Sequence, residues 1–319
     1  MNSGNTQDTS DIEKKLRGYL YGTACADALG RPVEHLTLEQ IKQKYGDKGI
    51  LELSPESPWT DDTQLMLVLA RGLFRGAELE LPKLMDKIAK ELVLWLDEPD
   101  LGAGATTKSA ALSLKEGIHW SNSGLNSKTC GSLMRVGIIG FVFRNDPEKL
   151  IKAASISGRI THTHPAADAA SVAGAYAVKL ALDWVKPRKM FEPLLEITQG
   201  ISPEFTQALE NSYKTAYSDI GDEEGLKKLG QGWYADETFA LAYFCILRYP
   251  NDFKKAVQTA VNITGDSDSV ASVAGGILGA RLGIEAIPIS WIEALKENEK
   301  IEEIVEPLLE KYLQLSGIN

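Results

Sequence analysis

The sequence has few cysteines, and those it has lie far apart. Only three occur among 319 residues, and no two of them form a CxxC pair. Scattered thiols with apolar or small neighbours favour free cysteines in a reducing compartment over a disulfide framework. The three are Cys25, Cys130 and Cys245.

Long apolar runs are also missing. No stretch approaches the roughly 18 apolar residues of a membrane-spanning helix. Residues 1–10 are polar and lack the apolar core of a signal peptide. We therefore expect a soluble, cytoplasmic protein that has no membrane partner, with residues 1–10 as a disordered tail.

Basic residues are fewer than acidic ones, with 34 Lys and Arg residues and 44 Asp and Glu residues. The net charge of −10 argues against nucleic acid as a partner, because phosphate-backbone binding needs a concentrated basic face. It does not exclude a small phosphorylated ligand, since bound cations can invert the local charge.

What the sequence has in abundance is helical periodicity. Apolar residues recur with helical spacing in almost every segment and strand-like alternation is scarce, which predicts an all-α protein. Hydrophobic residues make up 44% and charged residues 24%, as in ordinary globular proteins. No linker or composition break interrupts residues 11–319, so we expect a single multi-helix domain. The expected helices include 11–29, 81–96, 166–182, 287–297 and 299–315, and a long irregular segment is expected over 31–59.

A short acidic turn, Gly265-Asp266-Ser267-Asp268-Ser269, lies between two apolar, small-residue segments that we expect to be buried helices. One helix cap contributes about 1 kcal/mol and needs a single residue. Two carboxylates about 4 Å apart repel by roughly 4 kcal/mol at an effective dielectric of about 20. The second carboxylate is unfavourable unless a cation or solvent compensates, so this turn indicates a metal site.

A second acidic helix start, Thr60-Asp61-Asp62, precedes the apolar run 65–73. With the first it forms an all-oxygen ligand set, the kind that Mg²⁺ and Mn²⁺ prefer, whereas zinc sites usually recruit His or Cys. Six side chains exceed what one Mg²⁺ normally takes from protein, so two cations are possible. The set is Thr60, Asp61, Asp62, Asp266, Asp268 and Ser269.

Two glycine-rich segments, 97–108 and 127–137, each enter a helix, where backbone N–H groups can hold phosphate. Turn chemistry alone is the alternative for both. For His162 in the turn 161–165, a hydrogen bond into the cleft is favoured over metal binding. Asp27 is interpreted as a structural acid. Glu34 is either a general base or lid residue or an ordinary surface acid.

Together these motifs resemble the ADP-ribosylglycohydrolase family over about residues 13–297. The motifs are Gly22-Thr23-Ala24-Cys25-Ala26-Asp27-Ala28-Leu29-Gly30 with Pro32-Val33-Glu34, Trp59-Thr60-Asp61-Asp62-Thr63, Asp100-Leu101-Gly102 with Thr106-Thr107, Gly131-Ser132-Leu133-Met134-Arg135, Thr161-His162-Thr163-His164-Pro165 and Gly265-Asp266-Ser267-Asp268-Ser269. Each motif alone is weak evidence, but the occurrence of all six in the family's order makes the resemblance specific.

The resemblance implies an all-helical fold with two Mg²⁺ or Mn²⁺ ions, held by the six residues named above, at the bottom of a cleft. It implies catalytic roles for Asp61, Asp100 or Glu34, of which Glu34 matches a mobile loop acid. It also implies a substrate-binding set: Asp100 and Gly102 at the ribose, Gly131, Ser132, Leu133, Met134 and His162 at the phosphates and distal ribose, and Trp233 or Tyr234 at the adenine.

Departures from the family pattern are few, and all four metal-binding carboxylates are present. Cys130 stands where the family usually has Asn, which puts one polar contact to the ligand in doubt. Ser269 replaces the usual Thr and keeps the hydroxyl. We therefore expect an active enzyme.

The favoured hypothesis is a metal-dependent hydrolase that removes ADP-ribose from a modified protein side chain, arginine first. Serine-linked ADP-ribose and O-acetyl-ADP-ribose are alternative substrates. A non-catalytic ADP-ribose binder or immunity-type protein, which would occlude a toxin partner through the tail 1–10, is the alternative from another class.

Overall fold

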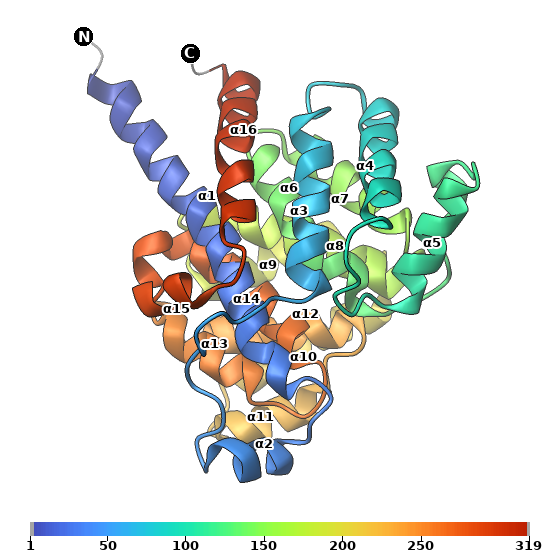
Figure 1. The fold of residues 1–319 in the computed structure, drawn as a ribbon. Helices are drawn as coiled ribbons and strands as arrows, with labels where there is room; N and C mark the ends of the chain where they lie inside the picture. The colour runs from blue at the N-terminus through green and yellow to red at the C-terminus, as the bar shows by residue number, and fades with distance from the viewer. Residues whose placement is uncertain (1–2, 318–319) are drawn as a thin grey trace.

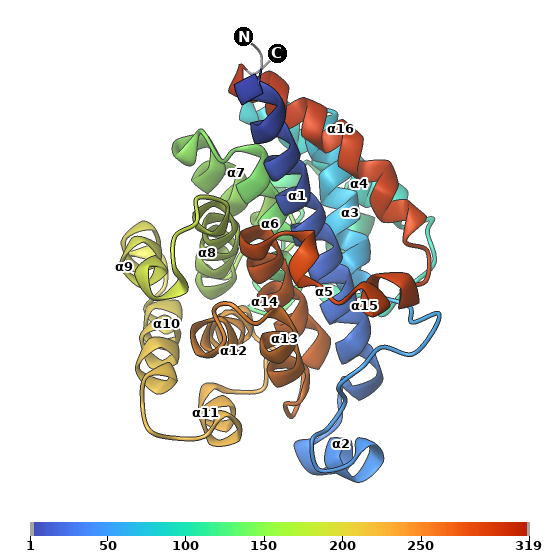
Figure 2. The same cartoon turned by 90° about the vertical axis from the view of Figure 1, so that its left-hand side faces the viewer.

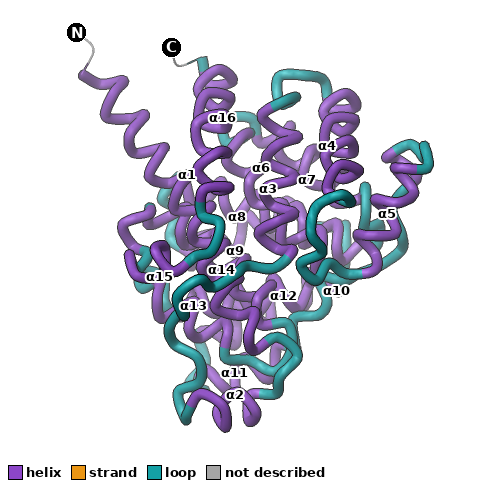
Figure 3. The backbone as a smooth tube through the Cα atoms, viewed as in Figure 1, coloured by secondary structure: helices purple, strands orange, loops and turns teal. Residues whose placement is uncertain are grey.

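Helices supply almost all of the regular structure in residues 3–317, which are the residues that the computed structural model describes (Figure 1). Within this range the only extended pairings are three isolated bridges, and Figure 3 shows helices and loops without a strand. The prediction of an all-α fold is confirmed. No helix of the described range is long and apolar enough to cross a membrane.

The α-helices follow one another through the chain as α1 (Ser3–Gly30), α2 (Leu38–Tyr45), α3 (Asp61–Phe74), α4 (Leu81–Trp95), α5 (Ala105–Lys115), α6 (Leu133–Val142), α7 (Pro147–Arg159), α8 (Pro165–Leu182), α9 (Pro187–Thr198), α10 (Pro203–Ala216), α11 (Asp222–Leu229), α12 (Ala235–Arg248), α13 (Phe253–Val261), α14 (Ser267–Leu282), α15 (Ile289–Ala294) and α16 (Glu299–Ser316). Short 3-10 turns are η1 (Arg31–Val33), η2 (Trp120–Asn122), η3 (Cys130–Ser132) and η4 (Ile284–Ala286).

The centre of the molecule is formed by α14, which packs on α1, α8, α12 and α13. Figure 2 shows α9 and α10 at one side of this centre and α4 and α16 at the other. Every residue of α14 except Leu282 is buried, in keeping with its small, apolar composition. Its N-terminal end, with the acidic turn, is therefore held within the surrounding helices.

Glycines let α1 and α14 cross in backbone contact. A Cβ atom at Gly279 would lie 1.9 Å from the carbonyl oxygen of Gly18, and one at Gly22 would lie 2.4 Å from that of Gly275. Further along the same contact, a Cβ at Gly30 would lie 2.4 Å from the Cα of Asp268. The C-terminal end of α1, and the loop that follows it, therefore lie directly against the acidic turn.

We predict that Gly279→Ala lowers the free energy of unfolding by about 3 kcal/mol, because overpacking against rigid backbone cannot be relieved by a rotamer change. Urea denaturation measures the effect. Gly221→Ala is the matched control, since a Cβ there meets nothing within 4 Å, and it should cost less than about 1 kcal/mol. Equal losses in both variants would contradict the proposed packing.

The predicted helices are present, with different ends. The first helix extends from Ser3 and not from Asp11, so it includes residues 3–10 of the expected tail, while residues 1–2 lie outside the described range. The segment 31–59 is not irregular throughout, since it contains α2. Eight residues are too few to show a helical period, but Thr37 caps α2 through a capping box with Gln40.

Candidate functional site

The two acidic helix starts meet in space. The N-terminal ends of α3 and α14 lie on one cavity of about 360 Å³, and the loop after α1 adds a fifth acid, Glu34, to their four. Oxygens of Glu34, Asp266 and Asp268 lie within 4.8 Å of one another, a spacing at which they could share a metal ion. We call the five lining acids the acidic cluster: Glu34, Asp61, Asp62, Asp266 and Asp268.

Hydroxyl groups of α14 connect the two helix starts. Ser269 Oγ donates to Asp62 Oδ1 at 3.2 Å, and Ser272 Oγ donates to Asp62 Oδ2 at 2.9 Å. Asp62 is almost fully buried, so these donors replace water at both of its oxygens. The contacts fix the first turn of α3 against the first turn of α14.

Burial raises the pKa of each acid in the cluster, and for Glu34, Asp61, Asp62 and Asp268 repulsion from neighbouring carboxylates adds to the effect. For Asp61 the pKa rises to about 7, through desolvation first and the charge of Asp27 next. The pKa values of Asp62 and Asp268 lie well above the ordinary range, because both groups are buried and because other carboxylates lie nearby. A set of crowded oxygen donors with this much uncompensated charge fits hard divalent cations.

Asp27 holds the start of α3 in place through hydrogen bonds to its backbone. It is fully buried and accepts hydrogen bonds from the backbone N–H groups of Thr60 and Thr63 at 3.0 Å each. The hydroxyl of Thr63 also donates to it at 2.5 Å. The interpretation of Asp27 as a structural acid is thus correct, and its partners are the residues that flank Asp61 and Asp62.

We predict that Asp27→Asn lowers the free energy of unfolding by about 2 kcal/mol. An amide must turn its NH₂ group toward one of these buried N–H donors, and hydrogen bonds to a charged group contribute about 1.5–3 kcal/mol each. Chemical denaturation checks this. Asp47→Asn, at an exposed position, should change the same quantity by less than about 0.5 kcal/mol. An unchanged midpoint for Asp27→Asn would contradict the supporting role.

Cys130 lines the cavity beside the cluster. Its thiol donates to Asp266 Oδ2 at 3.0 Å and lies 3.5 Å from Ser269 Oγ. Burial and the nearby Asp266 and Asp62 carboxylates raise the pKa of the thiol well above its ordinary value. In the absence of a cation the sulfur is therefore protonated.

Another part of the cavity lining carries neutral donors and acceptors. Nε2 of His162 lies 2.9 Å from the Thr129 hydroxyl and Nδ1 lies 2.8 Å from the Thr161 hydroxyl. Burial, and then the charge of Arg135, lower the pKa of His162 to about 3, so the ring is neutral at pH 7. His162 therefore forms hydrogen bonds and does not pair with His164 as a metal site, since His164 caps α8.

Gly131 leaves space beside His162 that a side chain would fill. A Cβ at Gly131 would lie 3.0 Å from both His162 Cε1 and Thr107 Oγ1. The N-terminal residues of α5, from Gly104 to Thr107, also line the cavity. Free N–H groups and the positive end of the helix dipole at such a start are suited to an anion.

The mouth of the cavity is formed by the loop after α1. The ring of His35 stacks on Trp233 with centroids 4.9 Å apart, and its Nε2 lies 3.0 Å from Glu34 Oε1. The Glu34 side chain is 30% exposed, so it faces both the cluster and solvent. Trp233 is also one wall of a neighbouring cavity of about 790 Å³, which Tyr234 lines as well.

Asp100 lies at the surface next to the cavity and not in its lining. Its side chain is 61% exposed and pairs with Lys108 at 2.7 Å, and the backbone N–H of Gly102 donates to it at 3.1 Å. The Lys108 contact, then that of Gly102, lower the pKa of Asp100. Gly102 has a φ of +109° and lies close to Asp61, since a Cβ there would be 3.7 Å from Asp61 Oδ1.

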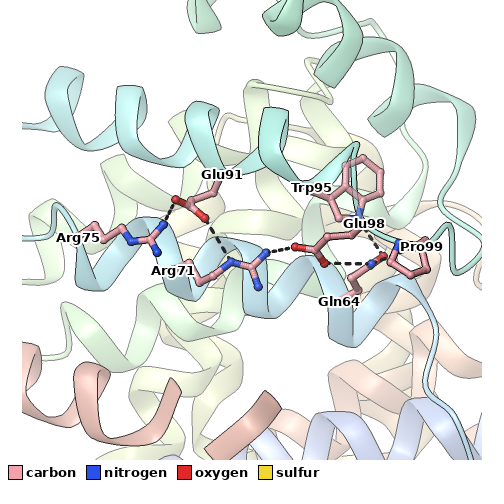
Figure 4. Close-up of polar contacts among 7 residues, drawn as sticks. All are labelled: Gln64, Arg71, Arg75, Glu91, Trp95, Glu98 and Pro99. Atoms are coloured by element: carbon pink, nitrogen blue, oxygen red, sulfur yellow. Dashed lines mark hydrogen bonds and ion pairs between the residues drawn. The ribbon is translucent and has the colours of Figure 1, made fainter. Parts of the chain in front are cut away.

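A polar network fixes the loop that carries Asp100 and Gly102 (Figure 4). Arg71 of α3 bridges Glu91 of α4 at 3.2 Å and Glu98 of the loop at 2.5 Å. Gln64 donates to Glu98 at 3.2 Å and to the carbonyl of Pro99 at 3.0 Å. The loop is thereby attached to the same helix that presents the acids at the start of α3.

The structure brings most of the predicted site residues together, but not all. Those that line the cavity are Glu34, Asp61, Asp62, Gly102, Gly131, Met134, His162, Trp233, Asp266, Asp268 and Ser269. Those outside the lining are Thr60, Asp100, Ser132, Leu133 and Tyr234. Thr60 is buried, and its hydroxyl accepts from the N–H of Asp62 as the cap of α3. Ser132 is fully buried, and its hydroxyl has no hydrogen-bond partner.

Contributors to the site that were not selected from the sequence include His35, Thr129 and Ser272. Thr129 lies in a glycine-rich segment that the sequence did single out. Ser272 is one helical turn after Ser269, a spacing that places both on one face of a helix. His35 has no comparable signal, because its ring contacts a tryptophan almost 200 residues away.

An all-helical fold with an acidic, cation-compatible cavity at two converging helix starts defines the class of protein. Residues 8–316 match the sequence model of the ADP-ribosylglycohydrolase family, and the chain belongs to that family. Its members are ADP-ribosyl hydrolases, so this protein is an enzyme of that kind.

Individual relatives extend over almost the whole chain. An uncharacterized protein of Archaeoglobus fulgidus is 33% identical, covering 95% of this chain and 99% of the relative. The ADP-ribosyl-[dinitrogen reductase] glycohydrolase of Rhodospirillum rubrum is 25% identical, covering 97% and 98%. The ADP-ribosylarginine hydrolase Tri1 of Serratia proteamaculans is 25% identical, covering 94% and 80%. A solved structure titled ADP-ribosylglycohydrolase-related protein complex superimposes with a TM-score of 0.75 at 25% identity, covering 95% of this chain and 99% of that one.

Proposed function

We propose that the protein hydrolyses the N-glycosidic bond between ADP-ribose and an arginine side chain of a modified protein, with the aid of two Mg²⁺ or Mn²⁺ ions. The observation that carries this proposal is the acidic cluster, where two helix starts and one loop present crowded carboxylates to a single cavity. The names of the Rhodospirillum and Serratia relatives support a protein-linked substrate, and the latter supports arginine.

In this proposal Thr60, Asp61, Asp62, Asp266, Asp268 and Ser269 hold the cations. When bound, the cations would orient the ribose hydroxyls and lower the pKa of a water molecule. The remaining carboxylate charge stabilises the positive charge that develops on the ribose ring, since glycosidic cleavage passes through an oxocarbenium-like state.

Glu34 is proposed to move the proton. Burial raises its pKa, His35 opposes the shift and Asp266 adds to it, so the carboxyl holds a proton more readily than an exposed glutamate does. Its position at the mouth gives it access to the leaving guanidine as well as to water. Asp61 is the alternative, and Asp100 is proposed to hold the terminal ribose.

The part of the lining that carries neutral groups is proposed to bind the diphosphate and the adenosine. The start of α5, the Gly131 loop (131–134) and neutral His162 offer N–H and hydroxyl groups to phosphate and the distal ribose. Adenine would lie toward Trp233 and Tyr234, which also border the larger neighbouring cavity.

The test is release of ADP-ribose from an ADP-ribosylated arginine protein in the presence of Mg²⁺, by the parent protein and by Asp266→Asn. We expect release by the parent only. Parallel assays with serine-linked ADP-ribose and O-acetyl-ADP-ribose decide the linkage. Binding of ADP-ribose without release from any of the three substrates would replace the hydrolase proposal with a non-catalytic binder that occludes a partner.

A further inference from the structure

The sulfur of Cys130 is aimed at the acidic cluster. It lies 3.0 Å from Oδ2 of Asp266, and Asp266 belongs to the group of three acids whose oxygens lie within 4.8 Å of one another. The sulfur also lies 3.5 Å from the hydroxyl of Ser269, another of the proposed metal ligands. The thiol is thus in contact with two of the groups that we propose for one cation.

Backbone contacts, and not a long side chain, set the position of this sulfur. Cys130 begins η3, and its carbonyl accepts from the N–H of Leu133. Just before it, the N–H of Ala235 donates to the carbonyl of Lys128 at 2.8 Å, and Thr129 forms a bridge with Tyr234. These contacts fix the Cβ of Cys130 beside the acidic cluster, so only rotation about χ1 can move the sulfur away from Asp266.

The distance between sulfur and oxygen suits a shared cation. A zinc ion binds sulfur at about 2.3 Å and carboxylate oxygen at about 2.1 Å, which places the two ligand atoms about 3.1 Å apart at a right angle and about 3.6 Å apart at the tetrahedral angle. The observed 3.0 Å is close to the right-angle separation, and the two atoms would move apart by about 0.6 Å to reach the tetrahedral one. The thiol proton now occupies the place between the two atoms, and a divalent cation could replace it.

We infer that Cys130 is a sulfur ligand of the cation centre, which therefore binds thiophilic divalent cations such as Co²⁺, Zn²⁺ and Cd²⁺ more tightly than its oxygen ligands alone would. Cation binding breaks the S–H bond, forms a metal–sulfur bond and releases the proton to solvent. Mg²⁺ gains little from sulfur, because it prefers oxygen ligands. This inference rests on the proposed metal centre.

The test is titration of the cation-free full chain with Co²⁺, followed by near-ultraviolet absorption, where a thiolate bound to Co²⁺ gives an intense charge-transfer band. We expect the band in the parent protein and its loss in Cys130→Ser, which removes the sulfur but keeps a small polar side chain. Cys25→Ala should retain the band, because Cys25 is fully buried in α1, outside the cavity lining.

Cation affinities supply a second measurement. Calorimetric titration of Cys130→Ser should show Cd²⁺ affinity reduced by about tenfold or more, since even indirect partners of metal ligands contribute 10–100-fold, with Mg²⁺ affinity unchanged. Co²⁺ binding that gives the same spectrum in the parent and in Cys130→Ser would overturn the inference and leave the metal centre intact. Failure of the parent to bind either Co²⁺ or Mg²⁺ would overturn the proposed centre itself, and the inference with it.

Discussion

Replacing Asp268 by Asn is expected to reduce ADP-ribose release by about a hundred- to a thousandfold, the cost of removing one well-placed electrostatic group. The same substitution is expected to stabilise the cation-free protein at pH 8. Asp268 is 4% exposed, and burial first, then the charges of Asp62 and Asp266, raise its pKa. Relief of one carboxylate pair can contribute up to about 4 kcal/mol at 4 Å and an effective dielectric of about 20.

The two effects have one cause, because the charge that destabilises the empty site is the charge that holds the cations. Asn keeps the size of Asp, and its amide oxygen can still accept from the N–H of Ser269, as Asp268 does at 3.0 Å. Turnover assays and urea denaturation in the presence of a chelator measure the two quantities. Asp219→Asn, at an exposed position, should change neither, and a lower stability for Asp268→Asn would contradict the proposed repulsion.

The convergence of the two acidic helix starts could be predicted from the sequence. Each start had more carboxylates than a helix cap requires, and charge of that kind in apolar surroundings needs a compensating group. The order of the surrounding motifs, through the family that they resemble, indicated the fold. Both arguments use only residue types and their order along the chain, so neither required the distance between the two helix starts.

Contacts between distant segments could not be predicted in this way. The pairing of Cys130 with Asp266 joins a 3-10 turn to a loop 136 residues later. The sequence indicated only that a polar contact might be lost at Cys130, whereas the structure shows a new contact to an acid of the cluster. The sequence did not decide whether Glu34 is a surface acid or a functional one, because nothing in a loop sequence gives its distance from Asp266 and Asp268.

The helical content of weakly patterned segments was also missed, for a physical reason. The residues from Ser3 to Ser10 are polar, and the residues of α2 bury only Ile41. Periodicity predicts helices through their apolar faces, and the sequence of neither segment has a pronounced one. The extra turns of α1 continue a helix that is already nucleated, so they add little cost.

Without divalent cations, the protein is expected to lose stability as the pH rises from about 4 to about 7. Burial and neighbouring carboxylates raise the pKa of Asp61 from 3.8 to about 7. In that interval the folded protein binds more protons than the unfolded chain, so the free energy of unfolding falls with pH, by about 1.4 kcal/mol per pH unit for each such group. For Asp61 alone the sum is about 4 kcal/mol, and the raised pKa values of Asp62 and Asp268 act in the same direction.

Mg²⁺ is expected to reverse this loss at pH 8, where the carboxylates are free to bind it, and to have little effect at pH 5, where protons compete. A ligand at a hundred times its dissociation constant stabilises the folded state by about 2.7 kcal/mol. Urea denaturation at both pH values, with chelator or with Mg²⁺, measures all four conditions. The Asp268→Asn variant serves as the control and should show a weaker dependence on both pH and Mg²⁺. A parent protein whose cation-free stability increases between pH 5 and pH 8 would show that the cluster is compensated by protein groups and does not require a cation.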